Sequence, residues 1–303
     1  MMRSLARLLG DEFSGFVLEK EPLSRHTTIR IGGPAALFIE AGDLRSLAFA
    51  CDACRELGIP WTMFGKGSNL PVSDAGFDGA VITLGAGFAK CAFDAESGVF
   101  TLGAGLRFSQ AVREAASLGR SGLEFAVGIP GTVGGAVRMN AGTRREFLGP
   151  RIVSVTTLRP GEGLRRYAAR DIEWNYRETS IPFDEVVLEC EVATAEGSEQ
   201  EIRRAMEKSQ ERRRITQPLG LPSCGSVFRN PEGESVGRLI ENVGLKGALC
   251  GGAQISERHA NFIVNKGGAK AVEVLSLIHA ASGAVAERYG VELVPEVRFL
   301  GFE

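Results

Sequence analysis

The chain has 303 residues, of which 44% are hydrophobic and 24% charged, which is typical of a globular protein with two or three domains. Its formal net charge of −2 excludes a global positive field that would attract nucleic acid or an anionic membrane. No run approaches the roughly 18 apolar residues of a membrane helix, and Asp11 and Glu12 interrupt any signal-peptide core. We therefore expect a cytoplasmic protein that captures anionic ligands through local charge and backbone geometry.

Short apolar runs beside glycine predict strands, and apolar residues at three- and four-residue spacing predict helices. The predicted strands are Ala36 to Glu40, Gly79 to Leu84, Val99 to Leu102, Ile152 to Leu158, Glu185 to Thr194 and Phe262 to Asn265. The predicted helices are Leu44 to Leu57, Phe108 to Leu118, Glu199 to Ile215 and Ala271 to Tyr289. This order predicts an α+β protein with two mixed regions before about residue 214 and a smaller αβ module after it.

Cysteine and histidine spacing does not predict a metal site. Cys51 and Cys54 are the one close cysteine pair, but a structural zinc site would need a second ligand pair at similar spacing. Both lie inside a predicted helix, whereas a thioredoxin-like pair begins one. We expect reduced thiols that pack as small apolar groups. The remaining cysteines are at 91, 190, 224 and 250, and the histidines are at 26, 259 and 279.

Two glycine loops suit a bound cofactor. The first is Gly65-Lys66-Gly67-Ser68-Asn69, and the second is Gly128-Ile129-Pro130-Gly131-Thr132-Val133-Gly134-Gly135-Ala136, which Asn140 follows closely. Neither fits the Walker or the Rossmann spacing. Glycine lets backbone N–H groups approach phosphate oxygens, so both loops suit a pyrophosphate. Each loop by itself is more typical of a tight turn, but two such loops in one chain favour a ligand role for the larger one.

Several motifs together resemble one family. They are HTTIRIGGPA at 26–35, GKGSNL at 65–70, GIPGTVGGAV at 128–137, MNAG at 139–142, Tyr176-Arg177, GSVFRNP at 225–231, GLKG at 244–247, HANFIVN at 259–265 and PEVR at 295–298. In this order they resemble the MurB family, UDP-N-acetylenolpyruvoylglucosamine reductase, in its shorter form. The chain departs from the family pattern at Thr143-Arg144-Arg145, where a small residue and an aromatic are typical.

The resemblance implies a fold and an activity. The fold is a two-part FAD-binding region of the PCMH/vanillyl-alcohol-oxidase type, at 1–82 and 83–214, followed by a smaller αβ substrate domain at 215–303. FAD is held non-covalently and is reduced by NADPH. The substrate is UDP-N-acetylglucosamine bearing an enolpyruvyl ether, and the product, UDP-N-acetylmuramate, serves peptidoglycan synthesis.

The resemblance also assigns residues. The cofactor-binding set is Gly65, Lys66, Gly67, Ser68, Asn69, Gly128, Ile129, Pro130, Gly131, Thr132, Gly134, Gly135, Ala136 and Asn140. Arg177 and Glu296 polarise the substrate carboxylate, and Ser226 donates the proton to the carbon that bears it. Further substrate contacts are Tyr176, Arg214, Asn230, Lys246 and Arg298.

From the residues alone, ordinary structural roles are favoured for Arg177 and Ser226 and are as open as the functional role for Glu296. Arg177 can be a surface arginine, Ser226 a turn serine, and Glu296 a strand-end glutamate paired with Arg298. Two other functions are also open, namely an FAD oxidase or dehydrogenase with the same cofactor domain, and a non-catalytic module that binds flavin or a UDP-sugar. We expect no nucleic acid, membrane or obligate protein partner.

Overall fold

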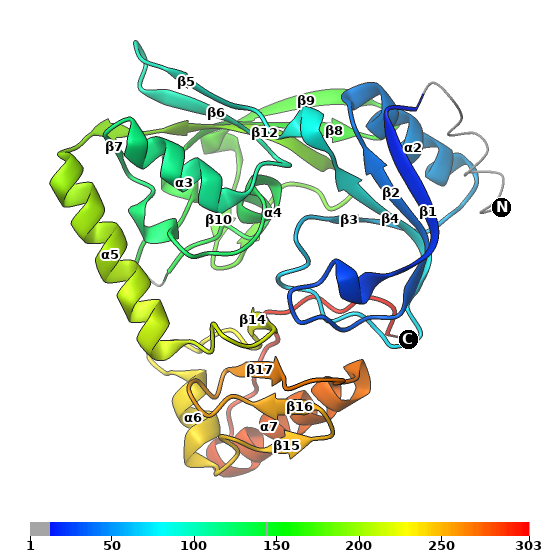
Figure 1. The fold of residues 1–303 in the computed structure, drawn as a ribbon, viewed down its shortest axis with the longest axis vertical. Coiled ribbons are helices and arrows are strands. Elements are labelled where there is room, and N and C mark those ends of the chain that lie inside the picture. The colour runs from blue at the N-terminus through cyan, green and yellow to red at the C-terminus, as the bar shows by residue number, and fades with distance from the viewer. Residues whose placement is uncertain (1–12, 144, 303) are drawn as a thin grey trace. The chain divides into compact units, whose positions relative to one another are not determined.

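The computed structural model describes residues 13–143 and 145–302, which divide into two compact units. The first unit contains residues up to 19, 37–65 and 79–211, and the second contains 20–36, 66–78 and 212–303. Figure 1 labels their helices and strands.

A four-stranded sheet has the order β1-β2-β4-β3, in which β3 runs parallel to β4. Its strands are β1 Gly15–Pro22, β2 Pro34–Ala41, β3 Trp61–Phe64 and β4 Phe77–Leu84. Helix α2 (Leu44–Glu56) begins where the Asp43 carboxylate accepts a 2.8 Å hydrogen bond from the Ser46 N–H. Its apolar face, with Cys51 and Cys54, packs in the core of the first unit, and burial raises the pKa of Cys54 to about 11. The helix therefore holds both thiols protonated, as the sequence predicts.

A five-stranded antiparallel sheet forms the larger part of the first unit, in the order β5-β6-β12-β8-β9. Its strands are β5 Cys91–Asp94, β6 Val99–Gly103, β8 Ile152–Arg159, β9 Gly163–Ala168 and β12 Val186–Ala193. Helices α3 (Phe108–Ser117) and α4 (Val133–Arg138) pack against it (Figure 1). Phe100, Phe108 and Val155 are buried between these helices and the sheet.

Short elements complete the first unit. They are the paired strands β7 Arg120–Ser121 and β13 Ala195–Glu196, the hairpin strands β10 Trp174–Asn175 and β11 Glu178–Thr179, and the 3-10 helices η2 Ala86–Phe88, η3 Glu124–Ala126, η4 Gly149–Arg151 and η5 Ala169–Asp171. Helix α5 (Glu199–Thr216) leads from this part of the chain toward residue 217.

The second unit contains an antiparallel sheet in the order β14-β17-β16-β15, against which α7 packs (Figure 1). Its elements are η1 Leu23–Arg25, β14 Ser223–Ser226, α6 Val236–Asn242, β15 Leu249–Cys250, β16 Ala253–Ile255, β17 Phe262–Asn265 and α7 Ala271–Tyr289. In residues 13–143 and 145–302, no helix has both the length and the apolar character needed to cross a membrane.

Two early segments, 20–36 and 66–78, belong to this second unit because they bond to its C-terminal part. The Asn265 side chain donates to the Ile29 carbonyl (3.0 Å), and the Ser73 N–H donates to the Leu300 carbonyl (2.9 Å). Ile29 is buried in the same core as Phe228. The grouping differs from the contiguous boundaries 1–82 and 83–214, and the functional division at those boundaries stays a prediction.

All the predicted helices and strands are confirmed. The bounds of β17 and α7 agree with the prediction at both ends, and each of the other predicted elements differs by one or two residues at one end or at both. Strand β1 was not predicted because exposed and charged residues fill most of it, so that it lacks a buried alternating face. The two-residue strands β10 and β11 are too short to show any period.

The start of α7 yields a test of the link between distant segments. The Asp74 carboxylate accepts hydrogen bonds from the Ala271 N–H (2.8 Å) and the Val272 N–H (3.1 Å). Asp74→Ala should lower the free energy of unfolding by about 1 kcal/mol, because these helix N–H groups lose their acceptor. Urea unfolding measures the change, and the exposed Asp78 provides the matched control, Asp78→Ala. Equal stability of the two variants would contradict the role of Asp74.

Candidate active site

Ser226 follows an irregular point in the sheet. Strand β14 pairs with β17 at Ser223 and Val264 and again at Ser226 and Phe262, with a register shift between them. Gly225 lies in this bulge at a φ of 80°, where other residues are strained. A bulge redirects the side chain that follows it. The structure thus gives a physical reason for glycine immediately before Ser226.

Glu296 lies directly beside the segment of Ser226. The Glu296 N–H donates a 2.7 Å hydrogen bond to the carbonyl of Val227, the residue after Ser226. Asn69 brackets Glu296 from a third segment, since its side chain donates to the Glu296 carbonyl (2.9 Å) and its own carbonyl accepts from the Arg298 N–H (2.9 Å). The structure therefore brings two predicted catalytic residues together with one predicted cofactor residue.

The first glycine loop approaches the same place. A Cβ added at Gly225 would lie 3.8 Å from the Ser68 carbonyl oxygen. Gly67 has a φ of 56°, and a side chain there would clash with the His26 carbonyl. The Thr28 hydroxyl then bonds to the carbonyl of Ser223 at 2.7 Å. Residues 66–69 thus lie against the bulged strand that carries Ser226.

The HANFIVN motif holds the backbone that follows Ser226 in place. The Asn261 side chain accepts from the Phe228 N–H (3.0 Å) and donates to the Phe228 carbonyl (2.8 Å). The His259 Nδ1 accepts the Asn261 N–H at 3.2 Å. Burial lowers the pKa of His259, so the ring is held neutral with its other nitrogen protonated. These contacts give His259 and Asn261 structural roles.

The second glycine loop lies in the first unit, where it meets Gly65. A Cβ added at Gly65 would lie 2.7 Å from the Thr132 hydroxyl oxygen, so only glycine permits this approach. Gly128 and Gly131 have φ values of 75° and 125°. Gly65 and the second loop thus bring together small residues with backbone N–H groups and a hydroxyl, and this donor set fits the pyrophosphate of FAD.

The loop does not offer all of its N–H groups to a ligand. The Val133 and Gly134 N–H groups donate to the Leu106 and Ala104 carbonyls, both at 2.9 Å. A Cβ at Gly134 would lie 2.9 Å from that of Ala104. Gly134 therefore serves close packing of α4, and its predicted contact with the cofactor stays a prediction, as do those of the other loop residues.

Arg177 lies in the two-residue turn between β10 and β11. It has a φ of 60°, a left-handed conformation that arginine adopts at an energetic cost, and its guanidinium lies 5.3 Å from the Tyr176 ring centroid. Non-glycine residues in such conformations cluster at functional sites. Tyr176 is 40% exposed, so both ends of this turn can be reached by a ligand.

Apart from Tyr176, the predicted substrate contacts lie in the second unit. Arg214 and Arg298 are exposed. The Asn230 side-chain oxygen accepts from the Val236 N–H (3.1 Å) at the start of α6, and Lys246 forms a 2.8 Å ion pair with Glu241. Asn230 and Lys246 thus have structural partners besides any ligand, and their substrate roles stay predictions.

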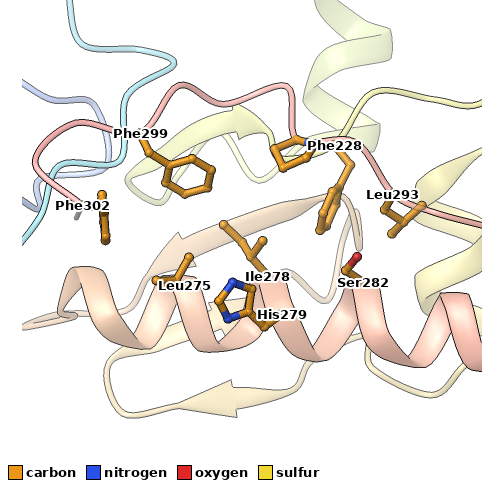
Figure 2. A pocket seen from close by; sticks show the side chains of 9 residues that line it. Phe228, Leu275, Ile278, His279, Ser282, Leu293, Phe299 and Phe302 are labelled. Carbon is orange, nitrogen blue, oxygen red and sulfur yellow. The ribbon is translucent and has the colours of Figure 1, made fainter.

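A separate pocket lies between α7 and the C-terminal segment (Figure 2). It has a volume of about 480 Å³ and is lined by Phe228, Leu275, Ile278, His279, Ser282, Leu293, Pro295, Phe299 and Phe302. Within the described chain, this lining holds no predicted site residue and no lysine or arginine. The pocket therefore does not suit a diphosphate, and we do not take it as the substrate site.

Two residues that support the site were not predicted individually, namely Asn261 and Arg258. The Arg258 side chain donates to the carbonyls of Arg214 (3.0 Å) and Gln217 (3.5 Å) near the end of α5. Arg258 lies far from α5 in the sequence, so no sequence signal points to this contact.

Comparison with known proteins defines the class first. The profile of an FAD binding domain matches residues 35–162, and that of the C-terminal domain of UDP-N-acetylenolpyruvoylglucosamine reductase matches 217–300. The chain is therefore an FAD-binding oxidoreductase with an added C-terminal domain, which confirms the predicted fold class.

Individual proteins then identify the family. A UDP-N-acetylenolpyruvoylglucosamine reductase of Heliobacterium modesticaldum is 44% identical over 96% of this chain and 92% of its own. One from Anoxybacillus flavithermus is 44% identical over 95% of each chain. The crystal structure of the Thermus caldophilus enzyme, MurB, has a TM-score of 0.82 at 36% identity and covers 95% of this chain and 100% of its own. The chain belongs to the UDP-N-acetylenolpyruvoylglucosamine reductase family.

The lowered pKa of His259 yields a pH prediction. The unfolded chain binds a proton at this histidine near the ordinary value of 6.5, whereas the folded chain resists it. Stability is therefore complete above that value and falls as the pH drops below it. His259→Asn should lose less thermal stability than the wild type between about pH 7.5 and 5.5. The control His279→Asn, at an exposed position, should keep the wild-type pH dependence.

Proposed function

We propose that this chain uses NADPH to reduce the enolpyruvyl ether of UDP-N-acetylglucosamine to UDP-N-acetylmuramate. The reaction is a cytoplasmic step of peptidoglycan precursor synthesis, and its other participants are small molecules. Family membership over almost the whole chain supports the reaction. The observation that carries the residue assignment is the placement of Ser226 and Glu296 on bonded segments, with Asn69 beside them.

The residues at the two glycine loops would hold the cofactor. Gly65, Gly128, Gly131 and Thr132 form the part of the cradle where small residues approach one another. When bound, FAD takes up two electrons as hydride from NADPH and supplies the hydride to the terminal CH₂ carbon of the enolpyruvyl group. The chain's own residues then have to stabilise negative charge and deliver a proton.

Arg177 and Glu296 act on the substrate carboxylate in this proposal. Hydride addition at the CH₂ carbon moves the electron pair of the double bond toward the carbon that bears the carboxylate, which gains enolate character. The guanidinium of Arg177 keeps its charge at every working pH and offers two donors to a carboxylate. Glu296, whose backbone is bonded to that of Val227, helps Arg177 to polarise the carboxylate.

Ser226 completes the reaction in this proposal by donating its hydroxyl proton to the enolate carbon. The new C–H bond forms as the O–H bond breaks, and the serine oxygen recovers a proton from solvent. Serine is a weak acid, so the step requires a strongly basic carbon and a fixed hydroxyl. The bulge at Gly225 and the bonds of Val227 supply the fixed backbone.

Ser226→Ala tests the proton donor. Flavin reduction by NADPH should proceed at the wild-type rate, while reoxidation of the reduced flavin by substrate should slow by about 10²- to 10⁴-fold. Anaerobic stopped-flow spectroscopy measures the two half-reactions separately. In the control Ser235→Ala, where the side chain makes no capping bond to α6, both rates should be kept. Full-rate reoxidation in Ser226→Ala would remove Ser226 from this role.

Arg214→Ala tests the nucleotide contact. Loss of a charged hydrogen bond to the diphosphate should raise the KM for the UDP-sugar roughly tenfold or more, with a smaller effect on kcat. Arg212→Ala is the matched control, because Arg212 is also exposed near the end of α5. Steady-state kinetics measures both constants. An unchanged KM in Arg214→Ala would exclude Arg214 from the site.

A further inference from the structure

The hairpin that carries Arg177 cannot hold its own shape. Its strands pair at Trp174 with Thr179 and at Asn175 with Glu178, and one hydrogen bond, from the Ser180 N–H to the Glu173 carbonyl (3.1 Å), extends the pairing. An isolated two-stranded hairpin is marginally stable even when it is longer. The turn also holds Arg177 in a left-handed conformation, which opposes hairpin formation. Contacts from outside the hairpin must therefore fix the place of the Arg177 backbone.

Asn140 supplies one such contact. It is 3% exposed, and its side-chain amide donates a 3.0 Å hydrogen bond to the carbonyl of Asn175, two residues before Arg177. Its side-chain oxygen accepts a 2.9 Å hydrogen bond from the Gly149 N–H. The second bond fixes the rotation of the amide, so that its donor faces the hairpin.

Gly149 and Trp174 complete the support at the base of the hairpin. A Cβ at Gly149 would lie 2.8 Å from the Trp174 ring, so glycine allows the indole to pack against the backbone. The Trp174 Nε1–H donates to the Ala169 carbonyl at 3.1 Å. Asn140 therefore links the two chain segments on either side of this packing.

Asn140 itself follows α4, the helix of the second glycine loop, and β10 lies near α4 in the same unit (Figure 1). Its φ of 41° is another left-handed conformation, which asparagine tolerates better than most residues. The residue thus connects the predicted cofactor loop to the turn that carries Arg177, the residue predicted to bind the substrate carboxylate, through one buried amide.

We propose that Asn140 is a positioning residue for Arg177: it holds the Tyr176–Arg177 turn through the Asn175 carbonyl. This inference rests on the proposed function, in which Arg177 contacts the substrate carboxylate. It adds to the predicted contact of Asn140 with the cofactor, which stays a prediction.

Asn140→Asp is the variant that tests the link. Aspartate has nearly the same volume, tolerates the same φ and keeps an acceptor for Gly149, but it places an oxygen against the Asn175 carbonyl. Amide hydrogen exchange over residues 174–180 should become faster by about tenfold or more. Reoxidation of reduced flavin by substrate should slow by about 10- to 100-fold, because Arg177 loses its alignment with the substrate carboxylate.

The flavin content and the NADPH half-reaction are measured on the same sample. With both rates expressed per bound flavin, equal slowing of the two half-reactions would overturn the positioning role. The control Asn175→Asp makes the same chemical change on an exposed side chain and keeps the Asn175 carbonyl, so its exchange should stay within about twofold of the wild type. Should Asn140→Asp fail to fold, Asn140→Gly removes both bonds without charge at a φ that glycine favours, and unchanged exchange in it would overturn the inference.

A double mutant separates this inference from the proposed function. In the Arg177→Ala background, Asn140→Asp should slow substrate-driven reoxidation little further, because Asn140 acts through Arg177. Additive effects would overturn the inference. If Arg177→Ala alone leaves reoxidation unchanged, the role of Arg177 in the proposed function fails, while hydrogen exchange still tests whether Asn140 holds the turn.

Discussion

The hydrogen bond from the Glu296 N–H to the Val227 carbonyl, 2.7 Å long, is the interaction on which half of the site depends. It joins the C-terminal segment to the strand that ends at Ser226, so the main chain sets the separation of these two residues. The bulge at Gly225 and the bracketing by Asn69 act on the same pair of segments. The two predicted catalytic residues are therefore fixed by peptide groups, which have few conformations, and less by long side chains.

Asparagine side chains link distant segments through hydrogen bonds of the kind that backbone groups make in a regular sheet. Asn69, Asn140, Asn261 and Asn265 each bond to main-chain groups of distant segments. A primary amide carries both a donor and an acceptor, so it can complete a ladder where two loops meet out of register. This allows irregular backbone near the site while the buried peptide groups stay paired.

The sequence predicted the regular part of the fold and the outline of the site. Helices such as α7 were found because their apolar period is long, and the family motifs identified the residues around Ser226 and Arg177. The bulge at Gly225 was not predicted because the strand that pairs with it, β17, is distant in the sequence. The hairpin of Arg177 was not predicted because its two-residue strands are too short to show a period. The hydrogen bond from the Gly134 N–H to the Ala104 carbonyl was likewise not predicted, because it is a tertiary contact.

The interleaving of segments 20–36 and 66–78 with residues after 212 has a consequence for synthesis on the ribosome. Ile29 belongs to a core whose other members include Val285, and Asp74 binds the start of α7. These early residues leave the ribosome long before their partners exist. The core of the second unit can therefore form completely only after translation has passed residue 285. Until then the apolar residues of its N-terminal segments stay exposed and can be bound by chaperones.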